Sequence, residues 1–277
     1  MVVLLGLLAA ITYGLGDFAG GLASRRHSAT TVLLYAYPVG AVLIAVMLPF
    51  FNGEVTGRTI LFGILGGCAG VVGVLVMYSL MAIAPMNIIS PVTAVLAAIV
   101  PVVVGVVLGE RPSSLAWIGM VLGILAVVLV SHTTEHHPHG KIALKIIVLA
   151  CLAGVGFGFY FVFLARAGHN SGLWPLMISR ITAALIIIPI ALRSRATIVI
   201  RGRWLLWAAG AGVFDATANL FFLLASRHGL LSVAGVLTSL YPAATVILAI
   251  TVLHEHVSKS QRVGLAVAAA SIVLITI

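Results

Sequence analysis

Three ionisable side chains lie well inside long apolar stretches of the sequence: Asp17, Arg180 and Asp215. A carboxylate or guanidinium in the middle of a membrane-spanning helix costs about 2.5–3.5 kcal/mol on insertion scales, so such a group is seldom kept without a partner or a polar cavity. Tyr13 precedes Asp17 by one helical turn and Asn219 follows Asp215 by one turn, so each pair shares a helix face. We expect the two polar faces to line one cavity.

Two kinds of chemistry are open to these charges. Either aspartate could bind a proton or another cation, and Arg180 could be its counter-ion or bind a substrate carboxylate. The alternative is a buried Asp–Arg ion pair that only fixes the register of its helices. Because Asp17 lies nearer the end of its apolar stretch, it could instead lie at the membrane interface.

Two proline-containing segments mark places where a transmembrane helix could open and present polar groups to a solute. Their residues are Ser90 and Pro91 in one segment and Thr238, Ser239, Tyr241 and Pro242 in the other. A proline removes one N–H from the helical ladder and frees a carbonyl, and broken helices supply such backbone groups to substrates in transporters. A kink without any ligand contact is the alternative.

Four histidines, His132, His136, His137 and His139, lie together in a short polar segment and suggest a metal site. Pro138 prevents a helix that would align them and no cysteine is nearby, so we predict no metal. The sequence also lacks the Gly-x-x-x-x-Gly-Lys-Ser/Thr phosphate loop and the grouping of histidines and carboxylates at one membrane depth that a membrane enzyme needs. We therefore predict no cofactor and no enzymatic activity.

The composition places these residues in a membrane protein. Of 277 residues, 62% are hydrophobic and 8% are charged, with a mean hydropathy of +1.26, whereas about 25% of the residues of a soluble domain are charged. The net charge of +9 does not indicate a nucleic-acid partner, because the basic residues lie at the ends of apolar runs, where such side chains contact lipid headgroups. We expect a multi-pass protein of the cytoplasmic membrane.

The apolar runs predict an all-α integral membrane protein with ten transmembrane helices, because open sheet edges or loops in lipid would leave backbone N–H and C=O groups unpaired. The expected spans are residues 2–22, 30–50, 59–81, 86–108, 114–131, 143–165, 172–192, 204–226, 229–253 and 260–277.

The ten spans divide into two similar halves of five. A polar linker at residues 132–141 separates a first repeat at residues 1–131 from a second at residues 142–277. Moving the first repeat along by 145 positions places Glu110 on Glu255. Because each half has an odd number of spans, the two copies must enter the membrane in opposite directions, as in the inverted repeats of many secondary transporters. We therefore expect a substrate path between the halves, near the middle of the membrane.

Three segments carry a specific resemblance to a known family. They are TYGLGDFAGGLASRR at residues 12–26, SPVTAVLAAIVPVVVGVVLGERPS at residues 90–113 and ATANLFFLLASRHGLLSVAGVLTSLYPAATVILA at residues 216–249. Over nearly its whole length the chain resembles the EamA-type carriers of the drug/metabolite transporter superfamily. The resemblance implies two repeats of five helices, with spans one to four and six to nine near the pathway and spans five and ten at the periphery.

The same resemblance implies transport of amino acids, purines, sugars, other metabolites or drugs without ATP hydrolysis, and it names no solute. The Gly-Glu-Arg sequence that usually ends a span in both repeats is present at residues 109–111 and is replaced by His-Glu-His at residues 254–256. For both glutamates we expect a local salt bridge or an anchor at the membrane interface.

We therefore predict an alternating-access carrier of a small metabolite, an exporter or exchanger, with protons as candidate coupling ions. Alternatives are efflux of multiple drugs or cationic compounds, a channel and a membrane sensor. We expect a monomer or weak homodimer whose partners are the solute and the lipid bilayer. Ten basic residues on one face, against four on the face with the termini, place the termini outside by the positive-inside rule. The family resemblance places both termini in the cytoplasm, so the direction of transport stays open.

Overall fold

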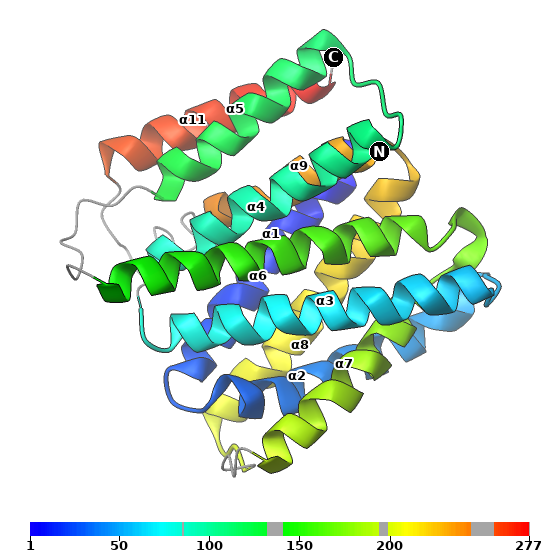
Figure 1. The fold of residues 1–277 in the computed structure, drawn as a ribbon, viewed down its shortest axis with the longest axis vertical. Coiled ribbons are helices and arrows are strands. Elements are labelled where there is room, and N and C mark those ends of the chain that lie inside the picture. The colour runs from blue at the N-terminus through cyan, green and yellow to red at the C-terminus, as the bar shows by residue number, and fades with distance from the viewer. Residues whose placement is uncertain (85, 132–140, 194–198, 245–257, 277) are drawn as a thin grey trace.

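The helices of the protein follow the apolar runs of its sequence. The computed structural model describes residues 1–84, 86–131, 141–193, 199–244 and 258–276, and these residues form helices and connections with no strand (Figure 1). Two short 3-10 helices, Leu48–Phe50 and His169–Ser171, lie in the α2–α3 and α6–α7 connections. The α-helices are α1 (Val2–Ser24), α2 (Ala29–Met47), α3 (Gly57–Met81), α4 (Met86–Val107), α5 (Ser114–Ser131), α6 (Lys141–Arg166), α7 (Trp174–Arg193), α8 (Arg203–Arg227), α9 (Leu231–Thr238) and α11 (Lys259–Thr276).

Seven helices within the described ranges are long and apolar enough to cross a membrane: α1, α2, α3, α6, α7, α8 and α11. Three shorter apolar helices, Val92–Val107, Ser114–Val130 and Leu231–Ala244, lie in the remaining predicted spans. The structure therefore supports an all-helical, multi-pass protein, whereas ten full-length spans are not confirmed. The histidines of the linker at residues 132–140 and the second Glu-containing span end at residues 254–256 lie outside the described residues.

Local sequence signals set the start of two of these helices. The hydroxyl of Ser28, immediately before α2, accepts a hydrogen bond from the backbone N–H of Thr31 at 3.2 Å. Thr56 before α3 does the same for the N–H of Thr59 at 3.1 Å. Each hydroxyl satisfies one of the N–H groups that the first turn of a helix leaves without an intrahelical partner.

Most of the extensive helix–helix contacts join the first half of the chain to the second. α1 packs along α8 and α3 packs along α6, while α2 contacts both α7 and α8 and α7 also contacts α3. α4 packs on α6 and α9, and α5 lies along α11 at the edge of the molecule (Figure 1). The two halves therefore interdigitate, and they do not form separate domains.

Glycines allow the closest of these approaches. A methyl group at Gly212 of α8 would overlap the carbonyl oxygen of Ala36 in α2, and one at Gly67 of α3 would lie 2.6 Å from the Cβ atom of Thr182 in α7. In lipid, where apolar side chains gain little by leaving the solvent, helices associate through such backbone contacts. These two seams bring α2, α3, α7 and α8 around one central region.

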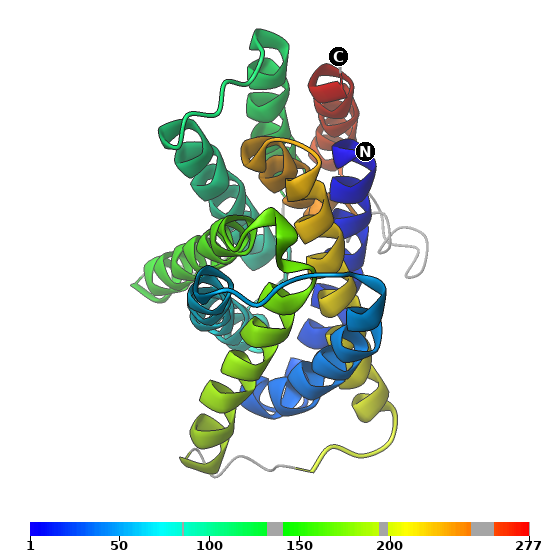
Figure 2. The ribbon, with the colours of Figure 1, turned by 90° about the vertical axis from the view of Figure 1, so that its right-hand side faces the viewer.

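Both ends of the chain lie on the same side of the molecule, at the right in Figure 1. The α2–α3, α4–α5, α6–α7 and α8–α9 connections lie on this side as well, and it faces the viewer in Figure 2. We call it the terminal face. Large apolar side chains such as Val42, Leu185 and Leu206 are exposed on the helices between the terminal face and the opposite face, as expected for a surface covered by lipid.

Candidate functional site

A central pocket of about 330 Å³ of empty volume lies where the two halves meet. Six helices line it: α1, α2 and α3 from the first half and α6, α7 and α8 from the second. α3 and α6 supply mainly apolar and small residues, including Val71, Val74 and Phe157. The polar and aromatic lining consists of Tyr13, Tyr37, Tyr160, Ser179, Arg180, Asp215 and Asn219.

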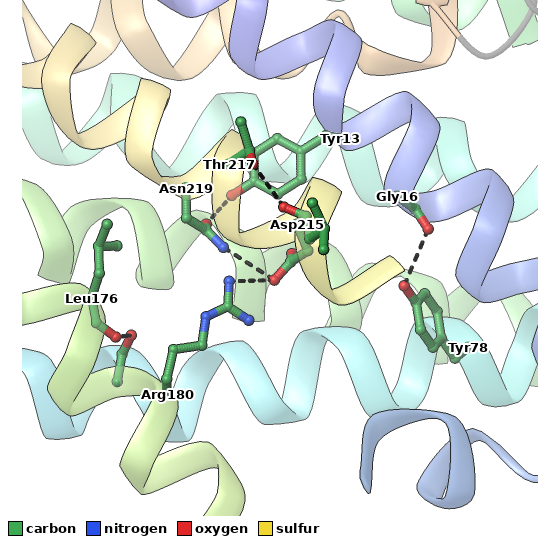
Figure 3. Close-up of polar contacts among 10 residues, drawn as sticks. Tyr13, Gly16, Tyr78, Leu176, Arg180, Asp215, Thr217 and Asn219 are labelled. Carbon is green, nitrogen blue, oxygen red and sulfur yellow. Dashed lines mark hydrogen bonds and ion pairs between the residues drawn. The ribbon is translucent and has the colours of Figure 1, made fainter. Parts of the chain in front are cut away.

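An ion pair between α7 and α8 is the main electrostatic feature of this pocket. The Nη2 atom of Arg180 lies 2.5 Å from Oδ2 of Asp215 (Figure 3), and it is the one ion pair found within the described part of the chain. The side chain of Arg180 is 4% exposed and that of Asp215 is 21% exposed. The guanidinium also lies 5.8 Å from the centre of the Tyr37 ring, within the range of a cation–π contact. The carboxylate is the more accessible of the two charges.

The close packing of α2 makes room for this arginine. Gly40 of α2 lies beside the guanidinium, because a methyl group there would be 3.5 Å from Cζ of Arg180 and 3.0 Å from the carbonyl oxygen of Gly212. A larger residue at position 40 would compete with the guanidinium for the same space. The backbone of α2 therefore forms one wall of the ion-pair site.

A hydrogen-bonded chain continues from the ion pair to α1. The Nδ2 group of Asn219 donates to Oδ2 of Asp215 at 3.2 Å, and the hydroxyl of Tyr13 donates to Oδ1 of Asn219. These contacts join α1, α8 and α7 (Figure 3). The structure thus brings together four of the residues that the sequence singles out.

Asp17 lies close to this group without joining it. It is half-buried on α1, one turn beyond Tyr13, and it is not among the residues that line the pocket. The neighbouring Gly16 packs against the backbone of Asp215, since a methyl group at Gly16 would lie 3.3 Å from the amide nitrogen of Asp215. The carboxylate of Asp17 makes no hydrogen bond or ion pair with any described residue. It remains an uncompensated acidic group next to the ion-pair site.

A second polar group lies between α4 and the residues after α9. The hydroxyl of Tyr241 donates to the carbonyl oxygen of Ser90 at 3.1 Å and lies 2.8 Å from Oγ1 of Thr93. The ring of Tyr241 also lies 6.3 Å from that of Tyr13, centre to centre. This group therefore adjoins the pocket through the two tyrosine rings and does not line it.

The two proline segments differ in backbone structure. α9 ends at Thr238, residues 239–240 form a turn, and helical backbone resumes at residues 241–244. The hydroxyls of Thr238 and Ser239 are buried without a hydrogen-bond partner among the described residues. α4, by contrast, is helical through Ser90 and Pro91, so the chain does not open there in this structure. One missing N–H removes a single hydrogen bond, which the rest of the helix tolerates.

Three aromatic or polar lining residues are not singled out by the sequence: Tyr37, Tyr160 and Ser179. None carries a charge, so none has the insertion cost that singles out Arg180 or an aspartate. Ser179 is adjacent to Arg180 in the sequence, but consecutive helix positions do not share a face. A tyrosine within an apolar run gives no signal that separates a pocket wall from the membrane interface.

Replacing Tyr13 with phenylalanine tests the hydrogen bond to Asn219. The change leaves a buried amide oxygen without its donor, which we expect to lower the free energy of unfolding by about 1–3 kcal/mol. Tyr37→Phe is the matched control, because the Tyr37 hydroxyl has no hydrogen-bond partner among the described residues. Thermal unfolding in detergent measures both variants, and equal melting temperatures would contradict a structural role for the Tyr13 hydroxyl.

Comparison with known proteins assigns this architecture to a family. The model of the EamA-like transporter family matches residues 1–132 and again residues 144–277. The chain belongs to the EamA-like transporter family. It is thus a multi-pass membrane protein related to the transporters of the drug/metabolite superfamily, as the sequence resemblance implies. EamA-like proteins are generally transporters and not enzymes.

Solved structures show the same fold. Matches extend to 29 solved chains. One of them, described only as the crystal structure of a protein, superposes with a TM-score of 0.82 at 16% sequence identity, covering 99% of this chain and 96% of the other. At that identity the likeness concerns the fold alone. No curated protein matches the chain.

Proposed function

We propose that this EamA-like protein is a secondary transporter that carries a small metabolite, an amino acid or a similar solute, across the cytoplasmic membrane as an exporter or exchanger. The observation that carries the proposal is the pocket with its buried ion pair, lined by three helices from each half. A site lined by helices from both halves can be exposed to either side when helices of one half move against helices of the other. Alternating access is therefore the mechanism we propose.

The packing of the helices supports two inverted repeats of five helices. If the halves are related by a two-fold axis, the contact of α1 with α8 must recur as a contact of α6 with α3, and the contact of α2 with α8 must recur as one of α7 with α3. Both contacts recur. α5 and α11, which would be equivalent, pack on each other. The double match of one family model to the two halves agrees with this arrangement.

The charges of the pocket favour a solute that carries both signs. A carboxylate on the solute would bind Arg180 and an ammonium group would bind Asp215, so that each buried charge keeps a partner when the internal ion pair separates. The rings of Tyr13, Tyr37 and Tyr160 would contact the body of the solute.

Efflux of purely cationic compounds is the main alternative, and the position of Arg180 disfavours it. A cation bound at Asp215 would displace the guanidinium of Arg180. Because the Arg180 side chain is only 4% exposed, its positive charge would then be buried without a partner. A buried charge that has lost its partner costs several kcal/mol. A zwitterion avoids this cost.

Counterflow into liposomes tests the proposed function. Purified protein should exchange a radiolabelled neutral amino acid against an internal excess of the same compound, and the initial rate should saturate with concentration. A panel of neutral, acidic and basic amino acids and one quaternary ammonium compound identifies the preferred charge type. A flux that rises linearly and is not accelerated by internal solute would indicate a channel and contradict the proposal.

Asp17 is our candidate for the coupling proton, because it is half-buried and lacks a cationic partner among the described residues. We expect Asp17→Asn to abolish the effect of an imposed pH gradient on uptake while counterflow at equal pH continues. Glu54→Gln, at an exposed position on the terminal face, is the control and should retain the effect. An unchanged pH response in Asp17→Asn would remove this carboxylate from the mechanism.

A further inference from the structure

The short helix α9 begins without a cap of its own. Its N-cap residue is Leu230, whose extended backbone (φ −68°, ψ 140°) suits the position but whose side chain cannot accept a hydrogen bond. Serine, threonine, aspartate and asparagine are the residues that normally accept hydrogen bonds from the first N–H groups of a helix. The first N–H groups of α9 must therefore find an acceptor elsewhere.

Glu110 from the other half of the chain supplies two acceptors. The N–H of Leu231 donates to Oε1 of Glu110 at 2.5 Å, and the N–H of Ser232 donates to Oε2 at 3.0 Å. The negative carboxylate also faces the positive end of the helix dipole of α9. Among the described residues Glu110 forms no salt bridge; its carboxylate instead joins the α4–α5 connection to α9.

The end of α4 is shaped to direct Glu110 at α9. Gly109 has a φ of +96°, which favours glycine. Its N–H donates to the carbonyl of Val106 at 3.0 Å, and the N–H of Glu110 donates to the carbonyl of Gly105 at 2.9 Å, the pattern of a Schellman motif. A methyl group at Gly105 would overlap the carboxylate, so glycine is needed there too.

Other polar contacts join the two halves on the same terminal face. Nε of Arg58 donates to the carbonyl of Arg166 at 2.8 Å, and the N–H of Glu54 donates to the carbonyl of Asn170 at 2.9 Å. The helix ends and connections that carry these groups lie on the side that faces the viewer in Figure 2. The contact of Glu110 with α9 is the one among these in which a charged carboxylate binds a helix end.

We propose that Glu110 is a positioning residue that holds the terminal face closed and releases α9 when the halves separate there. This inference rests on the alternating access proposed above. A carboxylate that bonds two backbone N–H groups of the opposite half stabilises only the conformation in which the halves touch. Its removal therefore shifts the population toward the conformation open at the terminal face.

Accessibility of a cysteine at position 232 tests the proposal without using transport. Ser232 is fully buried, so Ser232→Cys in a background with Cys68 and Cys151 replaced by alanine should react slowly with a water-soluble maleimide. Adding Glu110→Gln should raise the labelling rate by about 5- to 30-fold, the change expected from the loss of a helix cap. Glu54→Gln removes a charge from the same face and should leave the rate unchanged.

A further variant distinguishes a contact that holds the two halves together from simple capping of α9. Leu230→Ser supplies a cap within α9 itself. If Glu110 only stabilised the helix, Leu230→Ser in the Glu110→Gln background would restore slow labelling, and that result would overturn the proposal. If Glu110 joins the halves, labelling stays fast.

Gly105→Ala keeps the charge, displaces the carboxylate and should also raise the labelling rate. It is measured in place of Glu110→Gln should the latter fail to fold. Equal labelling rates in the Ser232→Cys background with and without the Glu110→Gln or Gly105→Ala change would also contradict the proposal. Because labelling requires no solute, its outcome is independent of the counterflow experiment.

Discussion

Replacing Arg180 with alanine is expected to abolish counterflow and to lower the free energy of unfolding by about 3–5 kcal/mol. The change leaves the carboxylate of Asp215, whose side chain is 21% exposed, without its cation. It also removes the group that we propose binds the solute carboxylate. Thermal unfolding in detergent measures the first effect, and the initial rate of counterflow measures the second.

The double variant Arg180→Ala with Asp215→Ala is the control that isolates the ion pair. Removing both charges leaves no buried charge without a partner, so the double variant should be more stable than Arg180→Ala alone. Neither variant should transport. If the two single substitutions were additive in the double variant, the ion pair would contribute nothing to stability. Transport by the double variant at the wild-type rate would remove both residues from the proposed binding site.

Adding one methyl group at Gly212 should have the second largest effect. In Gly212→Ala the new Cβ atom would overlap the carbonyl oxygen of Ala36 and lie 2.8 Å from its Cα atom, so α2 and α8 must separate. Because both obstructing atoms are backbone, no rotamer change relieves the contact. We expect a loss of about 1–3 kcal/mol in stability and a strong loss of transport, because Asp215 lies one turn further along α8.

Gly210→Ala, two residues earlier on the same helix, is the matched control. A methyl group there would meet only the ring of Phe214 at 3.9 Å, an ordinary contact. Alanine is also favoured over glycine inside a helix by about 0.5–1 kcal/mol, so this variant should melt at or above the wild-type temperature. Equal melting temperatures for the two alanine variants would show that α2 and α8 do not pack as closely as described.

Several features of the protein follow from its sequence because they depend on local physics. The length and apolarity of the runs predict helices in a membrane, since lipid offers no partner for an exposed backbone group. The cost of inserting a charge singles out Asp17, Arg180 and Asp215 among the apolar residues. The 3.6-residue period of a helix places Asn219 beside Asp215, and the hydrogen bond between them is present in the structure.

The partners of these groups could not be predicted in the same way. Arg180 could have paired with either aspartate, and the structure pairs it with Asp215, across α2, which packs against both α7 and α8. Tyr37 and Tyr160 line the pocket only because α2 and α6 turn those faces inward. Ser90 and Pro91 remain within a continuous α4 although their sequence resembles a helix break.

The amino-acid sequence is enough to show that this chain enters a membrane as helices, that it has two similar halves and which charges are unusual within lipid. The three-dimensional arrangement settles which of those charges pair, which uncharged residues surround them and that Glu110 caps a helix of the opposite half. The reason is the range of the forces involved. Burial cost and helical periodicity act within one segment, whereas an ion pair or a cap between residues far apart in the chain depends on how helix backbones approach one another, and that is set by packing.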